Sequence, residues 1–368
     1  MADHREQIDE LLERADDLDH GTAQLALAEE AVALADAHRD EDYGYTARLE
    51  LVSAGVFSGR TDLAMIAFSW VIAKHDADPQ RFDGERLLWM YKWILDGVAD
   101  YPNIPKAEIE KLFADMKARF EADGSTLHAY WGIRRNVAMF CGDRGAALDA
   151  NEKLQATDRD HLSNCHACVQ DESVEYYTFV GDDAAAVDAA RPIFKGKLTC
   201  GEVPERTFAG VQLPLLRLGK PADALAHFKA GYRKINFNPK FLRHKAMYLT
   251  SLTLTDNLDR AMKLLDRHLP ECLDVSSAYW QYEFLLAARV LCERLTEKGE
   301  TGLPVRIPDK LAALKGQPVT VAALAAWLDG ELARLAKSFD DRNGNTHFAD
   351  RVAGFRELFQ YAQPCRVK

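Results

Sequence analysis

The chain has 368 residues and a formal net charge of −11, and 48% of its residues are hydrophobic and 28% charged. This composition supplies enough apolar surface for a large core and excludes a disordered chain, while the negative charge disfavours nucleic acid as a partner because phosphates would be repelled. The 22 glycines and 13 prolines are a small share of the residues, which favours long helices over many short strands.

The segment 1–42 is expected to form a helical pair that caps the N-terminal end of the molecule, with helices at Asp3–Leu18 and Thr22–His38. Charged residues recur through Met1–Asp17 and leave no apolar stretch of the length that a signal peptide needs. We therefore expect a cytoplasmic protein. No segment reaches the roughly 18 consecutive apolar residues of a membrane-spanning helix, so no membrane partner is expected.

The segment 43–297 contains a repeat of about 38 residues. Short turns, each with an apolar helical run on both sides, recur at intervals of 38, 45, 39, 38 and 37 residues. The turn residues are Gly59, Gly97, Gly142, Gly181, Gly219 and Asp256. An alanine stands five residues after all of these turns but the second, at Ala64, Ala147, Ala186, Ala224 and Ala261. A fixed small residue allows two helices to pack closely, so the pattern predicts stacked helical hairpins.

The unit 208–236 carries a pattern of residue sizes that points to a family. In this unit a large residue, Leu215, is followed by the turn residue Gly219, the small residue Ala224 and two further large residues, Phe228 and Tyr232. In this it resembles the tetratricopeptide repeat superfamily, over roughly 43–273, with a period nearer 38 than the usual 34. The resemblance implies an all-α, right-handed α-solenoid whose first helices line a concave groove that binds peptides or partner proteins. Related solenoids built from helical pairs are the alternative.

The geometry of that family nominates polar residues for the groove. When positions are counted back from each turn, the nominated residues are Asn136, Met139, Asp171, Glu175, Thr178, Arg206, Arg243 and Thr250. Arg206 and Arg243 begin successive first helices, so we expect them to be neighbours that hold a carboxylate through bidentate hydrogen bonds. The alternative is that these side chains only cover helix surface.

Three of the seven cysteines have the character of metal ligands. Cys165 and Cys168 open the first helix of a hairpin on one face, and Cys200 follows the second helix, which returns to the same end. The predicted ligands of a structural zinc ion are Cys165, Cys168, Cys200 and His161, with His166 or Glu202 as alternatives for the fourth. Ordinary buried cysteines and a thiol-redox site are the other interpretations. No further cofactor is expected.

The C-terminal part contains a connection and a second cap. Prolines punctuate the segment 298–320, at 304, 308 and 318, and predict a long connection without regular structure. The segment 321–368 is predicted to cap the C-terminal end with helices near 321–339 and 348–361, because a terminal repeat would otherwise expose its apolar face.

Motifs of common enzymes are absent from the chain: it has no Gly-rich phosphate loop, no HExxH and no GxSxG. We therefore expect a non-catalytic adaptor or regulator that binds a peptide segment or partner protein of basic or mixed charge. One alternative is a metal-dependent or thiol-redox enzyme, or a maturation component, centred on Cys165, Cys168 and Cys200. The other is an architectural subunit of a larger assembly.

Overall fold

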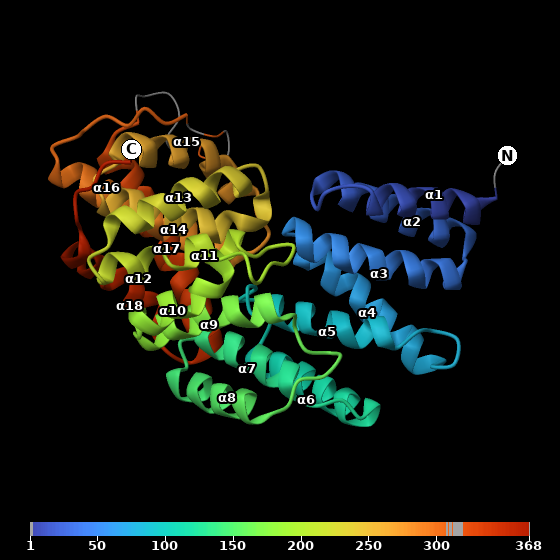
Figure 1. The fold of residues 1–368 in the computed structure, drawn as a ribbon. Helices are drawn as coiled ribbons and strands as arrows, with labels where there is room; N and C mark the ends of the chain where they lie inside the picture. The colour runs from blue at the N-terminus through green and yellow to red at the C-terminus, as the bar shows by residue number, and fades with distance from the viewer. Residues whose placement is uncertain (1–2, 307, 309–310, 312–318, 368) are drawn as a thin grey trace. The chain divides into compact units, whose positions relative to one another are not determined.

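The structure is a computed structural model that describes residues 3–306, 308, 311 and 319–367, and over these residues the chain is all-α, with 18 α-helices and no β-strand (Figure 1). The α-helices are α1 (His4–Asp16), α2 (Thr22–His38), α3 (Glu41–Ser58), α4 (Thr61–Ala77), α5 (Glu85–Val98), α6 (Lys106–Asp123), α7 (His128–Phe140), α8 (Arg144–Ala156), α9 (His166–Val180), α10 (Asp183–Phe194), α11 (Glu205–Gly210), α12 (Gln212–Arg217), α13 (Pro221–Ile235), α14 (Leu242–Leu254), α15 (Leu258–Asp274), α16 (Ala278–Glu297), α17 (Val321–Asn343) and α18 (His347–Ala353). Two 3₁₀ segments, η1 (Pro239–Phe241) and η3 (Phe355–Tyr361), accompany them.

The chain divides into two compact units. The first comprises Met1–Phe140 and Gly145–Ser163, and the second comprises Cys141–Arg144 and Asn164–Lys368. Helices α1–α7 and α8 beyond Arg144 therefore belong to the first unit, and α9–α18 belong to the second. The boundary falls inside the segment 43–297, and each unit is described below by itself.

Within each unit, helices contact their neighbours in the chain. Many helices also contact one that lies two or three places further along the chain. In the first unit α1 contacts α2 and α3, α3 contacts α4 and α5, and α5 contacts α6 and α7. In the second unit α9 contacts α10 and α11, α11 contacts α13 and α14, and α14 contacts α15 and α16. Helices α2, α4, α13 and α15 also contact the first helix of the next hairpin, so these hairpins pack on one another through both of their helices.

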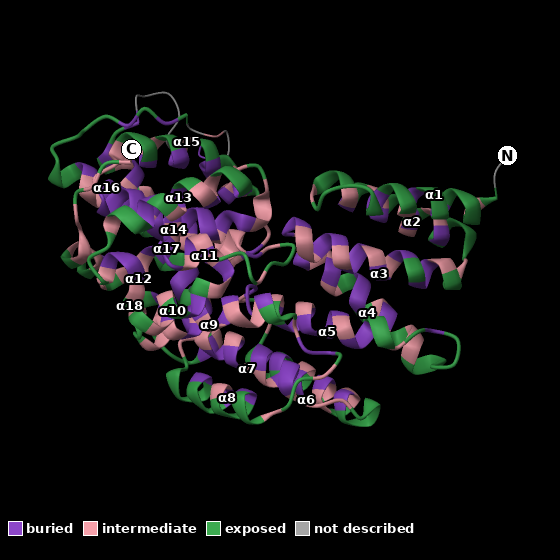
Figure 2. Ribbon diagram, viewed as in Figure 1, coloured by how far each residue is buried: buried purple, intermediate pink, exposed green. Residues whose placement is uncertain are grey.

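The alanines that follow the turns explain how the two helices of a hairpin pack so closely. Ala64, Ala147, Ala186, Ala224 and Ala261 all have 0% exposure. Figure 2 shows buried positions concentrated where helices face each other, with exposed positions on their outer sides. The prediction that these five alanines are packed in the interior agrees with their burial, and Ala64 lies close to Gly55 of the paired helix α3.

Most of the predicted turn residues end a helix in a left-handed backbone conformation, but one does not. Gly59, Gly142, Gly181 and Gly219 have φ values from +71° to +83°, and Asp256 has +56°. Gly97 instead lies inside α5, so its assignment as a turn was wrong. A Cβ at Gly97 would lie 2.8 Å from Cγ2 of Thr61, so this glycine allows α5 to pack against α4. The chain turns after it, between Ala99 and Pro105.

One first helix is divided into two short helices, α11 and α12, which meet at Val211. Pro214 lies in the first turn of α12 and has no backbone N–H. It cannot donate the hydrogen bond to the carbonyl of Gly210 that a continuous helix would require. The interruption places Arg206 on a helix of its own, between α9 and α14.

The C-terminal segment is helical only in part. The first predicted helix is confirmed and extends to Asn343, whereas the second ends at Ala353 and continues as the 3₁₀ segment η3. The chain beyond it runs along the end of α14, where the backbone N–H of Gln363 donates to the carbonyl of Leu254 at 2.9 Å. In the predicted connection, the N–H of Leu303 donates to the carbonyl of Val319 at 3.0 Å. Residues 307, 309–310 and 312–318 of that prediction lie outside the described residues.

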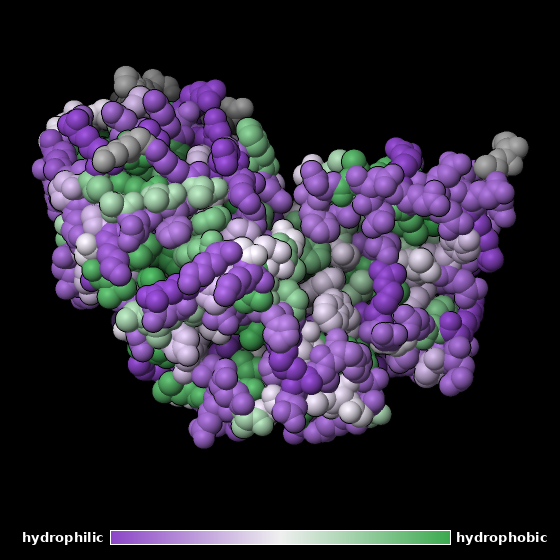
Figure 3. All heavy atoms as spheres, in the orientation of Figure 1, coloured by the Kyte–Doolittle hydropathy of each residue, from purple (hydrophilic) through white to green (hydrophobic). Residues whose placement is uncertain are grey.

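One face of the molecule is mainly polar. On the face drawn in Figure 3 hydrophilic side chains dominate, and hydrophobic ones appear in separate small groups. In the part of the chain that the structure describes, none of the helices combines the length and the apolar character that crossing a bilayer requires.

In the first unit, Asp40 joins two hairpins and supplies a prediction. Its carboxylate caps α3 by accepting from the N–H of Tyr43 at 3.2 Å, and also pairs with Nε2 of His4 at 2.9 Å and Nε of Arg5 at 2.6 Å. Burial alone would raise the pKa of Asp40, but the hydrogen bonds from His4, Tyr43 and Arg5 outweigh it and lower the pKa to about 2. We expect Asp40→Ala to cost about 1–2 kcal/mol, as the loss of a helix cap does.

The same variant should change the dependence of stability on acid. A carboxyl group with a lowered pKa in the folded state stabilises it above the pKa of the unfolded chain, near 4, and this stabilisation is lost as the pH falls toward 2. Thermal melts of the full chain between pH 2 and 7 test this. We expect the melting temperature of Asp40→Ala to fall less steeply than that of the wild type below pH 4. Parallel profiles would show that the carboxylate carries no such linkage.

Candidate binding surface and thiol cluster

Six of the residues nominated for the groove lie on neighbouring helices of the second unit. Asp171, Glu175 and Thr178 share one face of α9, because they are spaced by four and three residues. Arg206 lies on α11, and Arg243 and Thr250 lie seven residues apart on α14. Helix α11 contacts both α9 and α14. All six side chains except that of Asp171 are partly exposed.

The two nominated arginines bind the nominated carboxylates. The guanidinium of Arg243 donates to Glu175, with Nη1–Oε1 and Nη2–Oε2 distances of 3.2 Å each. Arg206 pairs with Asp171 at 3.1 Å, with Glu175 at 3.8 Å and with Glu202 at 3.6 Å. The three first helices are therefore joined by one network of charges. We expected these arginines to hold a carboxylate, and the carboxylates that they bind belong to the chain itself.

The network extends to residues that the sequence did not single out. Glu202 also pairs with Lys240, and Arg243 lies 5.6 Å from the ring centre of Tyr279 on α16. One turn further along α16, Glu283 accepts from Arg351 of α18 at 2.9 Å. We call the surface formed by Asp171, Glu175, Glu202, Arg206, Lys240, Arg243, Tyr279, Glu283 and Arg351 the charged surface. The repeat register derived from the sequence ended at the turn of Asp256, before α16, and therefore did not nominate Glu283.

The carboxylates of the charged surface differ in their affinity for protons. Burial raises the pKa of Asp171 to about 6, against the opposing effect of Arg206. Burial acts on Glu175 in the same direction, but Arg243 and Arg206 outweigh it and lower the pKa to about 2. Glu175 is thus ionised at every physiological pH. Asp171 is only 2% exposed and accepts from the hydroxyl of Thr207 at 2.6 Å, so a substrate could not reach it for proton transfer.

His244 is a buried polar side chain of this region. It lies on α14 beside Arg243 and is 8% exposed. Within the described residues, neither ring nitrogen of His244 makes a hydrogen bond. Burial, together with Arg243 and Arg206, lowers the pKa of His244 to about 3. The ring is therefore neutral and can both donate and accept a hydrogen bond.

The other two residues nominated for the groove lie in the first unit. Asn136 and Met139 are on α7 and are partly exposed. The side-chain amide of Asn136 donates to Asp96 at 3.2 Å and accepts from Arg135 at 3.2 Å. Its hydrogen-bonding groups are thus engaged within that unit.

The three thiols nominated as metal ligands converge as the hairpin argument predicted. The ligand atoms of Cys165, Cys168 and Cys200 all lie within 4.8 Å of one another, and together they could hold a metal ion. Cys165 caps α9, where its sulfur accepts from the N–H of Cys168 at 3.4 Å. Cys200 follows α10 in a tight turn in which its N–H donates to the carbonyl of Val203 at 3.0 Å. The two ends of the α9–α10 hairpin thus bring the sulfurs together.

The thiols are not equivalent in their chemistry. Burial acts to raise the pKa of Cys165, but hydrogen bonds from Cys168 and its backbone outweigh this effect and lower the pKa. Burial raises the pKa of Cys168. Of Cys165 and Cys168, Cys165 is therefore the more readily present as the thiolate that binds metals.

The residues proposed as a fourth ligand differ in their availability. His161 belongs to the first unit, where Nε2 lies 3.7 Å from the carboxylate of Asp123. Glu202 is already paired with Lys240 and Arg206. His166 is the exposed first residue of α9 and follows Cys165 directly. Zinc takes four ligands, commonly three Cys and one His, and the donor set of the three sulfurs fits that ion.

Comparison with known proteins gives no relative from which a role could be transferred. No family model matches the chain, and no curated protein matches it significantly.

Proposed function

We propose that this chain is a non-catalytic protein of the tetratricopeptide-like class, a solenoid of stacked hairpins with a helical cap at each end, which binds a segment of a partner protein. The observation that carries the proposal is the charged surface, where side chains from α9, α11, α14 and α16 meet. Contacts between successive first helices and the five buried alanines support the stacking of hairpins. A non-catalytic role agrees with the burial of Asp171 and with its engagement by Thr207.

The composition of the charged surface indicates the chemistry of the partner. Besides the buried Asp171, it contains three partly exposed carboxylates, at Glu175, Glu202 and Glu283, and four cations, at Arg206, Lys240, Arg243 and Arg351. Neither sign dominates, so we propose that the bound segment carries both charges. When such a segment binds, ion pairs within the charged surface can be replaced by ion pairs between the charged surface and the segment. Electrostatic complementarity of this kind sets specificity more than affinity.

Binding of peptides that differ only in charge tests the proposal. Labelled peptides of one length, with acidic, basic, mixed or neutral composition, are titrated with the full chain and followed by fluorescence anisotropy. We expect mixed peptides to bind most tightly, and Thr178→Arg to weaken them by placing a bulky cation on the face of α9. Thr157→Arg, directly after α8 of the first unit, is the matched control, because both hydroxyls donate to the carbonyl four residues earlier. Equal affinity for all four compositions would contradict the proposal.

A second proposal concerns the thiol cluster, which we assign to a structural zinc ion held by Cys165, Cys168, Cys200 and a fourth ligand. The ion would join the start of α9 to the turn after α10 and so fix one hairpin. Structural zinc sites contribute directly to folding stability. The observation that favours this role over ordinary cysteines is the convergence of the three sulfurs within 4.8 Å.

Metal analysis of the purified chain tests the zinc site. We expect about one equivalent of zinc in protein prepared without chelators, as a four-ligand site predicts. Replacing both Cys165 and Cys168 by Ser should remove the zinc and lower the melting temperature. Cys365→Ser, which changes a free thiol outside the cluster, should do neither. Wild-type protein with zinc far below one equivalent would rule the site out.

A further inference from the structure

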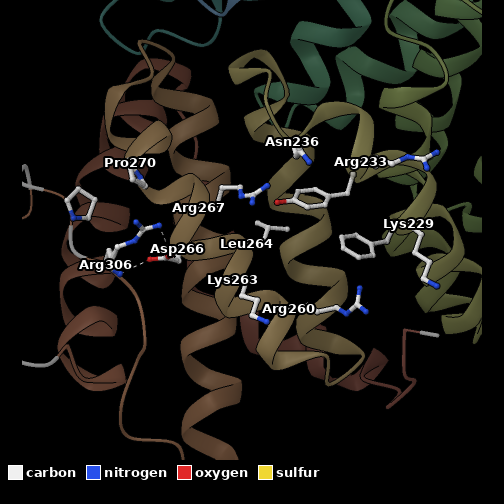
Figure 4. A pocket seen from close by; sticks show the side chains of 13 residues that line it. Lys229, Arg233, Asn236, Arg260, Lys263, Leu264, Asp266, Arg267, Pro270 and Arg306 are labelled. Carbon is white, nitrogen blue, oxygen red and sulfur yellow. Dashed lines mark hydrogen bonds and ion pairs between the residues drawn. The ribbon is translucent and has the colours of Figure 1, made fainter.

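A pocket of about 850 Å³ lies between α13 and α15 of the second unit (Figure 4). Its wall contains the cationic residues Lys229, Arg233, Arg260, Lys263, Arg267 and Arg306. Figure 4 shows Leu264 near the middle of the wall, with Arg260, Lys263 and Arg267 around it. A strongly basic pocket stands out on a chain whose net charge is −11. It is also separate from the residues of the charged surface.

Helical periodicity explains why the cations gather there. Lys229 and Arg233 are one turn apart on α13, and Arg260, Lys263 and Arg267 follow one another at spacings of three and four on α15. Residues at these spacings share one face of a helix. Each helix thus contributes a row of cations to the wall of the same pocket. Like charges at such spacings repel each other and weaken a helix, so the rows do not serve stability.

Within residues 3–306, 308, 311 and 319–367, the chain neutralises little of the positive charge of the pocket. Asp266 contributes a carboxylate to the wall, and it is engaged by Arg306, whose backbone N–H and Nη2 lie 2.6 Å and 3.3 Å from it. Within the described residues, Lys229, Arg233, Arg260 and Lys263 form no ion pair and no side-chain hydrogen bond. By contrast, every cation of the charged surface has a carboxylate partner. The four cations are therefore available to an anion from outside.

The inner wall of the pocket is apolar and firmly held. Phe228 and Leu264 are 6% and 2% exposed and contribute to it. The hydroxyl of Tyr232, another wall residue, lies 2.9 Å from Nε2 of His268, and Nδ1 of that ring lies 2.9 Å from Glu271. This chain of hydrogen bonds fixes the tyrosine ring. Asn236 adds a buried side-chain oxygen that has no hydrogen-bond partner in the described residues.

We propose that this pocket binds a small organic polyanion, a phosphate ester of about the size of a nucleotide. Arginine guanidinium groups bind phosphate through paired hydrogen bonds, and lysine binds it as a point charge. The volume lies in the range of sites for small molecules, which combine an apolar wall with a few polar groups. The phosphates pair with Arg233, Arg260 and Lys263, and the organic part of the ligand lies against Phe228 and Leu264.

Titration calorimetry of the full chain with two probes, ATP and inorganic tripolyphosphate, tests this assignment. We expect both to bind at low salt, and ATP to bind more tightly because only ATP has an organic part to place on the apolar wall. Affinity for both should fall as salt is added, since the contacts are between exposed charges. The double substitution Arg260→Gln and Lys263→Gln should weaken both by about tenfold or more.

The matched control is the double substitution Lys195→Gln and Lys197→Gln, which removes two exposed cations outside the pocket and changes the net charge equally. We expect it to leave both affinities unchanged. Failure of both probes to saturate the protein would overturn the proposal, and so would equal weakening in the two double variants. An acidic peptide or single-stranded DNA that binds more tightly than ATP, and only when Arg260 and Lys263 are present, would overturn it in favour of a macromolecule.

Discussion

Replacing Gly231 by Ala is expected to destabilise the second unit by about 3 kcal/mol, at the upper end of the usual range for overpacking a core. A Cβ atom at this position of α13 would lie 2.0 Å from the hydroxyl of Tyr248 on α14 and 2.7 Å from Cβ of Phe208 on α11. Neither neighbour can move easily, because Tyr248 is completely buried and the Cβ of Phe208 is fixed by its backbone. The methyl group would push α13 away from both helices.

The matched control for this prediction is Gly330→Ala. Gly330 lies inside α17, is exposed, and has no atom within 4 Å of an added Cβ. Alanine there should raise stability by about 1 kcal/mol, the difference in helix propensity between the two residues. Urea denaturation of the full chain, followed by circular dichroism, measures both variants. A Gly231→Ala variant as stable as the wild type would mean that α13 does not pack this closely on α11 and α14.

Replacing Arg243 by Met is expected to cost about 3 kcal/mol, at the lower end of the range for breaking a buried ion pair. The cost arises because Glu175 would keep its charge without the residue that compensates it most. We choose the lower end because Arg243 and Glu175 retain 24% and 20% side-chain exposure. Methionine keeps much of the volume of the side chain and its contact with Tyr279, so the loss is mainly electrostatic.

A double-mutant cycle isolates that interaction. We expect the variant that combines Arg243→Met with Glu175→Gln to recover most of the lost stability, because no unpaired charge remains. The wild type should also lose stability as the pH falls from about 4.5 toward 2, the window between the unfolded pKa of Glu175 and its lowered value in the folded state. Arg243→Met should lose less over that window. Strictly additive effects of the two substitutions would disprove the coupling.

The elements that the sequence predicted are those that depend on local geometry. Glycine at a turn adopts the left-handed conformation at little cost, so Gly59 and Gly181 could be located from their spacing alone. The alanines could be assigned to the core because hairpins repeat one contact. The convergence of Cys165, Cys168 and Cys200 followed from the similar lengths of the two paired helices α9 and α10.

The features that the sequence did not predict depend on contacts between distant segments. Gly97 has the spacing of a turn residue, but its role is to accommodate Thr61, which lies on a different helix. The extension of the charged surface to Glu283 and Arg351 joins residues 68 positions apart. The basic pocket combines cations of α13 and α15 that never form a run in the sequence, so a search for consecutive basic residues could not find it.

Hydrogen exchange of the full chain, with and without the mixed-charge peptide that binds it most tightly, tests the central claim most directly. Binding across the first helices should slow exchange in α9, α11, α14 and α16. The second helices α10, α13 and α15 should change less. Slower exchange confined to the second helices, or a peptide that binds without slowing exchange in any first helix, would contradict the proposed binding surface.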